Sequence, residues 1–393
     1  MSPAPLRLVY VSHSFPPPGR PLANVGGRQR HAVGLQAALA NHPDVALTSL
    51  VLRTSAAAQF PRMWPYMASL LVNLPGVVAR ERADVVLFGS MVTAALAPTL
   101  QRIRRGGVPL AVVVHGQDIT LPNTVWQWWV RRVIRAVDGL LPVSDATGAE
   151  CVARGAQPTR VHMVPCAVDT TAYWRPRDRP AERRLLLDWL SSGGRPIPGD
   201  AFLVCGVGRH MERKGFHWFA GEVLPRLPER VHFVLAGTGP LTPEVREAAA
   251  QAGVAPRLHL LGKVTDERLG LVYRGSDCFV MPNVPVAGDM EGFGIVMLEA
   301  GLSGLPIVAT DLEGIRSAIR PGMNGTLVPA RDADAFAAAI LPLMTSPGLW
   351  AQTSERTARY TAATWSWDAV VQQFVTQLRE LAGRRPEGLQ RPA

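Results

Sequence analysis

The sequence predicts an α/β protein with two doubly wound, Rossmann-like domains, and three observations support this fold class. The chain has 393 residues, which at about 100 to 200 residues per domain is enough for two domains. Short apolar runs alternate with helical segments along most of it, an order typical of parallel sheets covered by helices on both faces. The alternation stops once, in a segment rich in Pro, Gly and Arg between Arg175 and Asp200, and then resumes.

The first series of strands and helices spans residues 1–178, and we expect it to form the N-terminal domain. Its strands are short β-branched and apolar runs, and its helices are longer segments with a three- or four-residue apolar period. The expected elements are strand Leu6–Val11, helix Arg30–Ala40, strand Val45–Leu52, helix Trp64–Arg82, strand Val85–Phe88, helix Val92–Arg104, strand Leu110–Val114, helix Thr124–Ala136 and strand Gly139–Pro142. This order predicts a parallel sheet.

A second series of the same kind follows a predicted linker at residues 179–200 and occupies residues 201–364. Its expected strands are Phe202–Val207, Val231–Ala236, Leu258–Leu260, Cys278–Met281, Pro306–Ala309 and Gly325–Val328. A last helix is expected at 365–385, where apolar residues recur at three- and four-residue steps. Open parallel sheets bind ligands at the carboxyl ends of their strands, so the two domains are expected to enclose a cleft.

Composition excludes several classes of protein. Hydrophobic residues make up 47% and charged residues 18%, which fits neither a disordered chain nor a coiled coil. No apolar run approaches the roughly 20 residues of a membrane span, and the start lacks the pattern of a secretory signal. The four cysteines are far apart, which argues against zinc sites and disulfides. We therefore expect a cytoplasmic enzyme or binding protein with four buried cysteines.

Positive charge is concentrated in the first half of the chain. Residues 1–180 hold 19 Arg and Lys against 9 Asp and Glu, whereas residues 181–393 hold 22 of each. This imbalance predicts that the first half meets an anionic partner such as a phosphate, a lipid surface or a nucleic acid. Only two of the cations are lysines.

The segment from Pro282 to Thr310 carries two glutamates, Glu291 and Glu299, with a Gly-Phe-Gly turn after the first. A helix that starts near Gly294 would leave the backbone N–H groups of Gly294, Ile295 and Val296 free to bind a diphosphate. Glu299 would then lie at the height of a ribose, and Glu291 would face the group beyond the phosphates. A surface helix with two solvated carboxylates is the alternative.

Cations follow two predicted strands of the second half. Arg209 and Lys214 come directly after the first of these strands, where both are positioned to reach a diphosphate. Lys263 and Val264 follow another strand, where their backbone is expected to line a base pocket. For Arg209 and Lys214 the alternative is an exposed basic loop, and for Lys263 and Val264 it is a plain turn.

In the first half, His115 stands at the end of an apolar strand, with Gly116 beside it and Asp118 placed to order the turn. A histidine there is positioned to hydrogen bond a sugar hydroxyl, and a structural histidine is the alternative. Gly26 and Gly27 lie in the first strand-to-helix connection and permit close approach to a phosphate or sugar.

These motifs together resemble the retaining, GT-B-fold glycosyltransferases of family four, the group that includes bacterial phosphatidylinositol mannosyltransferases. The resemblance runs in family order through FPPPGRPLANVGGRQRH, VVVHGQD, LPVSDAT, VPCAVDTTAYW, GVGRHMERKGF, LAGTGP, LGKVTDERL and the segment from Glu291 to Glu299. It implies transfer of a hexose from a UDP- or GDP-linked donor to a hydroxyl acceptor, such as a glycolipid or a cell-envelope polysaccharide precursor. It also implies that the last helix returns to the N-terminal domain, the acceptor side.

The resemblance implies a role for each site residue. Arg209 and Lys214 would hold the donor diphosphate, Glu299 the ribose, and Glu291 and His115 the hexose. Further donor-binding positions are predicted at Gly27, Lys263, Val264, Phe293, Gly294, Ile295 and Val296. Acceptor-side residues are predicted at Gly26, Arg30 and Asp118. Because the cations supply the charge that a divalent ion would otherwise bring, we expect no essential metal and no other cofactor.

Two other classes of function stay open. A peripheral membrane or lipid-binding protein is indicated by aromatic and apolar residues beside arginines. These residues are Trp64, Tyr66, Leu70, Leu71 and Val78 in one segment, and Trp126, Trp128 and Trp129 before Arg131, Arg132 and Arg135 in another. Core packing of the tryptophans is equally expected. A sugar-nucleotide epimerase or a phosphorylase would share the fold, whereas a nucleic-acid binder matches no motif here.

Overall fold

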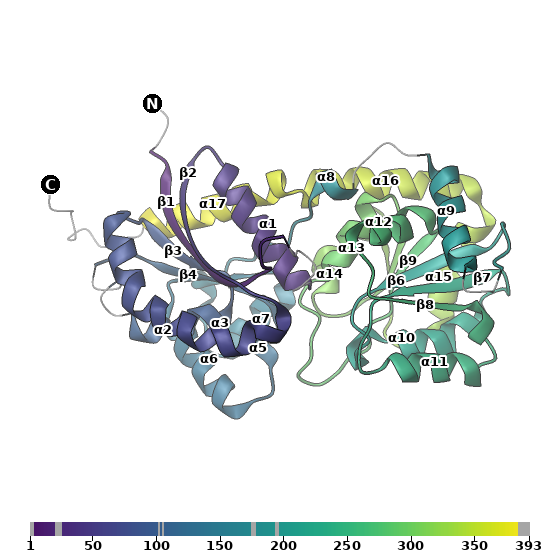
Figure 1. The fold of residues 1–393 in the computed structure, drawn as a ribbon, viewed down its shortest axis with the longest axis horizontal. Helices are drawn as coiled ribbons and strands as arrows, with labels where there is room; N and C mark the ends of the chain where they lie inside the picture. The colour runs from purple at the N-terminus through teal and green to yellow at the C-terminus, as the bar shows by residue number, and fades with distance from the viewer. Residues whose placement is uncertain are drawn as a thin grey trace. The chain divides into compact units, whose positions relative to one another are not determined.

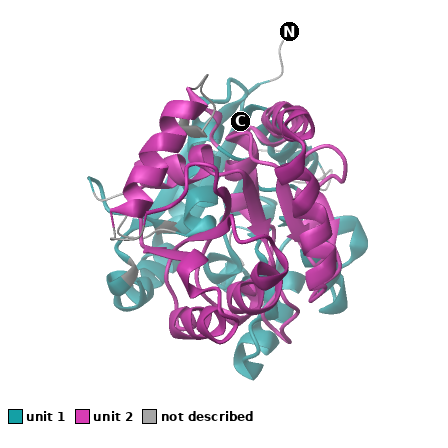
Figure 2. Ribbon diagram, turned by 90° about the vertical axis from the view of Figure 1, so that its right-hand side faces the viewer, with its two compact units in different colours: residues 1–168, 367–393 teal, residues 169–366 magenta. Residues whose placement is uncertain are grey.

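A computed structural model describes residues 4–19, 26–100, 103, 106–173, 178–192 and 196–383. The chain divides into two units (Figure 2): unit 1 contains residues 1–168 and 367–393, and unit 2 contains residues 169–366. Each unit is built around one parallel sheet with helices on both faces (Figure 1), which confirms the predicted fold class.

The sheet of unit 1 has five parallel strands in the order β2-β1-β3-β4-β5. Its strands are β1 Leu6–Phe15, β2 Val45–Arg53, β3 Val85–Phe88, β4 Leu110–Val114 and β5 Gly139–Pro142. Its helices are α1 Gly27–Asn41, α2 Ala56–Arg80, α3 Met91–Ala94, α5 Gly116–Thr120, α6 Thr124–Ala136, α7 Asp145–Ala153 and α17 Trp367–Gly383. Strands β3, β4 and β5 are buried at every position, as expected for a parallel sheet covered on both faces.

The sheet of unit 2 has six parallel strands in the order β11-β10-β9-β6-β7-β8. The strands are β6 Phe202–Val207, β7 Val231–Ala236, β8 Leu258–Gly262, β9 Cys278–Met281, β10 Ile307–Thr310 and β11 Thr326–Val328. The helices are α8 Thr170–Tyr173, α9 Arg179–Ser191, α10 Phe216–Trp218, α11 Thr242–Gln251, α12 Asp266–Gly275, α13 Ile295–Leu302, α14 Ile315–Ala318, α15 Ala333–Thr345 and α16 Pro347–Trp365. Strand order reverses between β6 and β9, where ligands bind in such sheets.

The segment expected to be a linker at 179–200 is different in the structure. Helix α9 occupies much of it and packs on α12 of unit 2. Arg183 forms an ion pair of 2.6 Å with Asp277, and Arg274 forms one of 2.5 Å with Glu182. The PRDRP and SSGGRPIPGD sequences therefore flank an integral helix, and unit 2 begins at Asp169 rather than at the expected residue 201.

Two helices also differ from expectation. Helix α2 begins at Ala56 rather than Trp64 and runs through three prolines. Its buried residues Leu74 and Val77 pack in the core, and this packing outweighs the backbone hydrogen bonds that the prolines remove. The helix expected at Val92–Arg104 is α3 followed by a short 3-10 turn at Ala97–Thr99; part of its end lies outside the described residues.

The last helix, α17, belongs to unit 1. It packs along α1, where the ring of Trp367 lies 5.4 Å from that of His31. All four cysteines are free and buried, as the sequence predicts.

Candidate functional site

A buried ion pair joins the loops that follow β6 and β9, which are neighbours in the sheet of unit 2. Lys214 ends a 3-10 turn at Glu212–Lys214 and is 7% exposed. Its Nζ donates a hydrogen bond to Oε2 of Glu291 at 2.5 Å, and Glu291 is 8% exposed. The carboxyl ends of two strands therefore bring together two predicted site residues.

Three more side chains surround this pair, and sequence analysis missed them. The Nε of Arg213 lies 3.6 Å from Oε2 of Glu291, and its Nη1 lies 3.3 Å from Oδ2 of Asp289. The Nδ2 of Asn283 donates to Oε2 of Glu291 at 3.2 Å. Asn283 and Arg213 each lie in the loop after a strand, so the strand-end rule that identified Lys214 applies equally to them.

Burial and neighbouring charge act in opposite directions on the pair. Burial lowers the pKa of Lys214, and the charge of Glu291 offsets part of that effect. Burial by itself would raise the pKa of Glu291, but Lys214 and Arg213 hold that pKa below its usual value. Glu291 is therefore ionised at neutral pH, with cations on its Oε2 side.

Glu299 lies on α13 and is 2% exposed. Its Oε2 accepts a hydrogen bond from the hydroxyl of Tyr273 at 2.9 Å, a partner that sequence analysis did not identify. Helix α13 begins at Ile295, one residue after the predicted start, and Gly294 before it adopts the left-handed conformation with φ of +88°. No side chain caps this end, so the first amides of α13 keep the anion-binding capacity of a helix start.

The other predicted site residues of unit 2 lie outside the buried contacts of Lys214, Glu291 and Glu299. Arg209 is exposed, and among the described residues it takes part in no ion pair. Lys263 is exposed and Val264 half-buried, both just beyond the end of β8. Phe293 is 3% exposed and packs edge-on against Trp365 of α16 with ring centres 5.7 Å apart, so its side chain belongs to the core of unit 2.

In unit 1, His115 directly follows β4 and precedes α5. Burial, together with the smaller effect of the Arg28 charge, lowers the pKa of its imidazole to about 3, although the backbone hydrogen bond to Gly89 acts in the opposite direction. Burial similarly lowers the pKa of His13 to about 4. Both rings are therefore neutral at physiological pH. The Nε2 of His115 is buried with no hydrogen-bond partner among the described residues.

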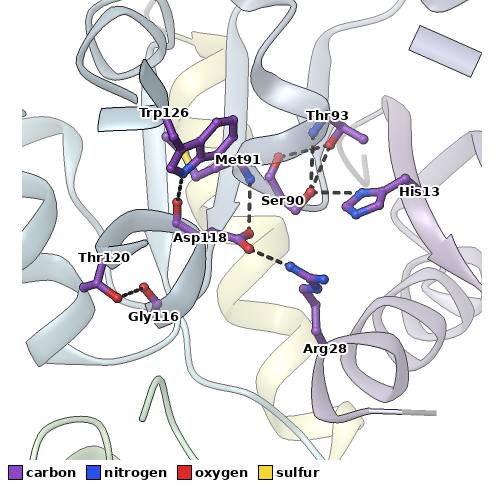
Figure 3. A network of polar contacts seen from close by, with 9 residues as sticks. All are labelled: His13, Arg28, Ser90, Met91, Thr93, Gly116, Asp118, Thr120 and Trp126. Atoms are coloured by element: carbon purple, nitrogen blue, oxygen red, sulfur yellow. Dashed lines mark hydrogen bonds and ion pairs between the residues drawn. The ribbon is translucent and has the colours of Figure 1, made fainter. Parts of the chain in front are cut away.

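Asp118 contacts different groups from those expected, as Figure 3 shows. Its Oδ1 forms a 2.7 Å ion pair with Arg28, and its Oδ2 accepts from the backbone N–H of Met91 at 3.3 Å. The same network places His13 Nδ1 3.2 Å from the hydroxyl of Ser90. The carboxylate of Asp118 thus joins α1, α3 and α5, whereas its backbone amide donates to the carbonyl of His115 at 3.0 Å.

The double glycine leads into α1: Gly26 precedes the helix, which begins at Gly27. Arg30 is half-buried in its first turn. Arg28, which sequence analysis missed, lies in the same turn as Arg30 and forms an ion pair with Asp118. Much of the Pro-rich loop before them, residues 20–25, lies outside the described residues.

Two kinds of feature are absent from the described part of the chain. No cluster of three or more His, Cys, Asp or Glu side chains there is arranged to hold a metal ion. No helix in the same residues has the length and hydropathy needed to span a bilayer.

Two family models match the chain. "Glycosyltransferase Family 4" matches residues 22–172, and "Glycosyl transferases group 1" matches residues 201–346. The two matched segments fall largely within unit 1 and unit 2 respectively.

Several similar curated proteins are named for inositol-containing molecules. D-inositol 3-phosphate glycosyltransferase 2 of Catenulispora acidiphila is 31% identical, over 82% of this chain and 72% of that protein. A GDP-mannose-dependent alpha-(1-6)-phosphatidylinositol monomannoside mannosyltransferase of Mycobacterium tuberculosis is 27% identical, over 78% of this chain and 79% of its own. A D-inositol 3-phosphate glycosyltransferase of Rhodococcus erythropolis is 33% identical over 71% of this chain, which spans only 64% of that relative.

Solved structures share the fold at low sequence identity. Anabaena Alr3699/HepE in complex with UDP has a TM-score of 0.73 at 17% identity, covering 95% of this chain and 100% of that one. The catalytic domain of starch synthase IV from Arabidopsis thaliana, bound to ADP and acarbose, has a TM-score of 0.75 at 15% identity, covering 97% and 100%. These likenesses agree with the expected GT-B fold.

Proposed function

Because the chain belongs to glycosyltransferase family 4, we propose that it transfers a hexose from a UDP- or GDP-linked donor to a hydroxyl group, with retention of anomeric configuration. The buried ion pair between Lys214 and Glu291, at the strand ends of unit 2, carries this proposal. The pair consists of a fixed cation and a fixed carboxylate at the carboxyl ends of two neighbouring strands, which is where open parallel sheets bind nucleotides. Lys214, Arg213 and Asn283 offset the cost of burying the ionised carboxylate of Glu291, which is 8% exposed.

The donor diphosphate gains negative charge as its bond to the sugar breaks, and cations already in place lower the barrier for that step. We assign this role to Lys214 and to Arg209, whose guanidinium has no carboxylate partner among the described residues. The acceptor oxygen forms the new bond to the anomeric carbon while the phosphate oxygen leaves. The acceptor proton passes to the leaving diphosphate, so no side-chain nucleophile is needed.

The other residues bind and orient the donor in this proposal. The first amides of α13 bind phosphate and sugar oxygens, and Glu299, oriented by Tyr273, accepts the ribose hydroxyls. Lys263 and Val264 line the base pocket through their backbone. Glu291 receives a sugar hydroxyl. In unit 1, we assign a hydroxyl of the hexose to the neutral imidazole of His115, whose Nε2 has no hydrogen-bond partner among the described residues.

The acceptor in this proposal is a glycolipid or another cell-envelope precursor that carries an anionic group. Two observations support it. The relatives named above act, by their names, on inositol phosphate and a phosphatidylinositol mannoside. The excess of positive charge lies in the first 180 residues, and Arg28 and Arg30 stand beside Gly26 at the start of α1. We assign acceptor binding to this part of unit 1.

Nucleoside diphosphates are expected to raise the melting temperature of the protein. A ligand at about 100 times its Kd stabilises the folded state by about 2.7 kcal/mol. Differential scanning fluorimetry with UDP, GDP and ADP, each with EDTA and with Mg²⁺, measures the shift. We expect one nucleotide to stand out and its shift to persist in EDTA, because we propose no essential metal.

Glu299→Gln is expected to reduce this shift, since a carboxamide replaces one of the acceptor oxygens assigned to the ribose. Glu247→Gln on the exposed side of α11 is the matched control and should keep it. If no nucleotide stabilises the wild-type protein, the donor assignment is wrong. Transfer of labelled sugar to inorganic phosphate would indicate the phosphorylase alternative, and conversion of the labelled sugar nucleotide to its epimer would indicate the epimerase alternative.

We also propose that unit 1 contacts an anionic membrane surface through α2 and α6. Neither helix contains Asp or Glu. Both present large apolar side chains to solvent: Phe60, Trp64 and Val72 on α2 are 77%, 68% and 76% exposed, and Val125 and Trp128 on α6 are 73% and 52% exposed. On their other sides the two helices pack into one core over the same face of the sheet. Arg132 stacks on the ring of Trp128 at 3.9 Å.

The structure narrows the set of aromatic residues expected at a lipid surface. Tyr66 is tied to the carbonyls of Ser12 and Leu50, and the indoles of Trp126 and Trp129 donate to the carbonyls of Asp118 and Ala95. Leu70 and Val78 are buried in the core. These five residues therefore serve packing, and of the expected set Trp64, Leu71 and Trp128 stay exposed.

The protein is expected to float with anionic vesicles and much less with neutral ones. Each large apolar side chain buried in the interface contributes about 1.5 to 3 kcal/mol, and each basic residue about 1 kcal/mol. Replacing Trp64 and Trp128 together by Ser should lower binding by at least about tenfold. Leu185→Ser on α9, at an exposed position of unit 2, is the matched control. Absence of binding to both vesicles would remove the membrane proposal and with it a location at the inner face of the membrane.

A further inference from the structure

Glu313 has an unusual backbone conformation in the loop that follows β10. Its φ is +45°, in the left-handed region that residues with a side chain rarely adopt. Among the described residues, Arg82 and Arg331 are the other two non-glycine positions with positive φ. The carboxylate is half-buried close to those of Glu291 and Asp289, so burial and these like charges raise its pKa. Strain of this kind persists where the surrounding contacts require it.

The contact that Glu313 makes is with the main chain of Glu291. Its Oε2 accepts a hydrogen bond from the backbone N–H of Glu291 at 2.5 Å. The neighbouring Gly314 donates its own N–H to the carbonyl oxygen of Glu291 at 3.1 Å. Both backbone polar groups of Glu291 are thus held by two consecutive residues of another loop.

The two loops are in direct contact here. A Cβ added at Gly314 would lie 2.0 Å from the carbonyl oxygen of Gly292 and 2.6 Å from that of Glu291, so no larger residue fits between the loops. Glu313, next to Gly314, has the left-handed backbone, and from this position its side chain reaches the Glu291 amide.

Glu291 is therefore held at both its carboxylate and its backbone. Lys214 and Asn283 hold its Oε2, whereas the loop after β10 holds its backbone. We propose that Glu313 is a positioning residue that fixes the main chain of Glu291, so that the Glu291 carboxylate is aligned with the transferred sugar before reaction. This inference rests on the proposed function, because it assigns an alignment that matters only if Glu291 meets a sugar.

Glu313→Gly separates alignment from stability. Glycine adopts the left-handed conformation without steric cost, and this relief opposes the stability lost with the hydrogen bond, so the variant should melt near the wild-type temperature. It also removes the acceptor of the Glu291 amide. Losing a hydrogen bond to a charged group corresponds to roughly a tenfold fall in rate, and we expect that fall in kcat with the donor KM nearly unchanged. Glu313→Gln keeps a side-chain oxygen that can accept the same bond, and should restore most of kcat.

Arg331→Gly is the matched control. Arg331 also has a left-handed backbone, with φ of +59°, but it is exposed after β11 and lies outside the Glu291 contact. It should share any gain in melting temperature and leave kcat unchanged. Wild-type kcat in Glu313→Gly, or failure of Glu313→Gln to restore it, would overturn the positioning role.

The same experiment tells the two proposals apart. A wild-type protein that binds no nucleoside diphosphate and transfers no sugar overturns the proposed function, and the positioning role with it. A wild-type protein that does both, alongside an equally active Glu313→Gly variant with normal nucleotide binding, overturns the positioning role alone.

Discussion

Arg209→Ala is expected to lower turnover by roughly 100- to 1,000-fold, because removing one preorganised group that stabilises developing charge typically costs about 2.7 to 4 kcal/mol. The structure makes the guanidinium available: it is exposed, and no ion pair within the described residues neutralises it. Its removal leaves no buried charge unpaired, so the melting temperature should stay within about a degree of wild type. Initial rates at saturating donor and acceptor, with thermal denaturation in parallel, measure both quantities.

Two further variants serve as comparisons for Arg209→Ala. Arg209→Lys keeps a positive charge and should recover part of the lost activity, although a lysine cannot contact two phosphate oxygens in the planar geometry of arginine. Arg246→Ala removes another exposed arginine of unit 2, on α11, and should leave activity unchanged. An Arg209→Ala enzyme that keeps more than about a third of wild-type kcat would exclude this side chain from stabilising the leaving group.

Lys214→Ala is expected to lose both activity and stability. The variant keeps the Glu291 carboxylate, on a side chain that is 10% exposed. The remaining cation beside it is Arg213, whose Nε lies 3.6 Å from Oε2 of Glu291. Breaking a buried pair by removing one partner costs about 3 to 5 kcal/mol, and loss of the cation should lower kcat by roughly 100-fold or more. Chemical denaturation and initial rates provide the two measurements.

The double variant Lys214→Met with Glu291→Leu separates the two effects. Apolar residues of similar volume often replace a buried ion pair without loss of stability, so this protein should melt near the wild-type temperature and still be inactive. Recovery of activity along with stability would show that the pair serves the fold alone.

The contribution of the same ion pair to folding stability should decrease at acidic pH. Because the pKa of Glu291 is lowered in the folded protein, its stabilising contribution is present above the usual value of 4.5 and is lost as pH falls through the lower folded value. Wild-type stability should therefore approach that of Glu291→Gln only below pH 4.5.

Much of the fold is encoded in local patterns. Strands β4, β6, β7 and β9 have the predicted bounds at both ends, because a largely apolar run of four to six residues between turn signals is a local property. The departures occurred where packing overrides local preference. The sequence predicts a start near Trp64 for α2 and a linker where Pro and Gly surround α9, yet both helices bury apolar or paired faces against their own unit.

The residues that we propose for contact with a membrane surface show the same limit. Periodicity and composition picked out aromatic residues beside arginines, but burial divides them: Trp128 is 52% exposed, whereas Trp129 packs against the core with its indole bonded to Ala95. Neighbouring residues of one helix point to different sides, and only the packed helix shows which side meets the sheet.

The amino-acid sequence by itself determined the two doubly wound domains, the family, and the positions of Lys214, Glu291 and Glu299, because strand and helix periods and strand-end positions are properties of nearby residues. Tertiary structure alone decided what those side chains touch. Tyr273 reaches Glu299 across 26 residues, and Glu313 reaches Glu291 across 22. Such partners depend on strand order and on how separate loops come together, and these follow from packing of the whole unit rather than from any local pattern.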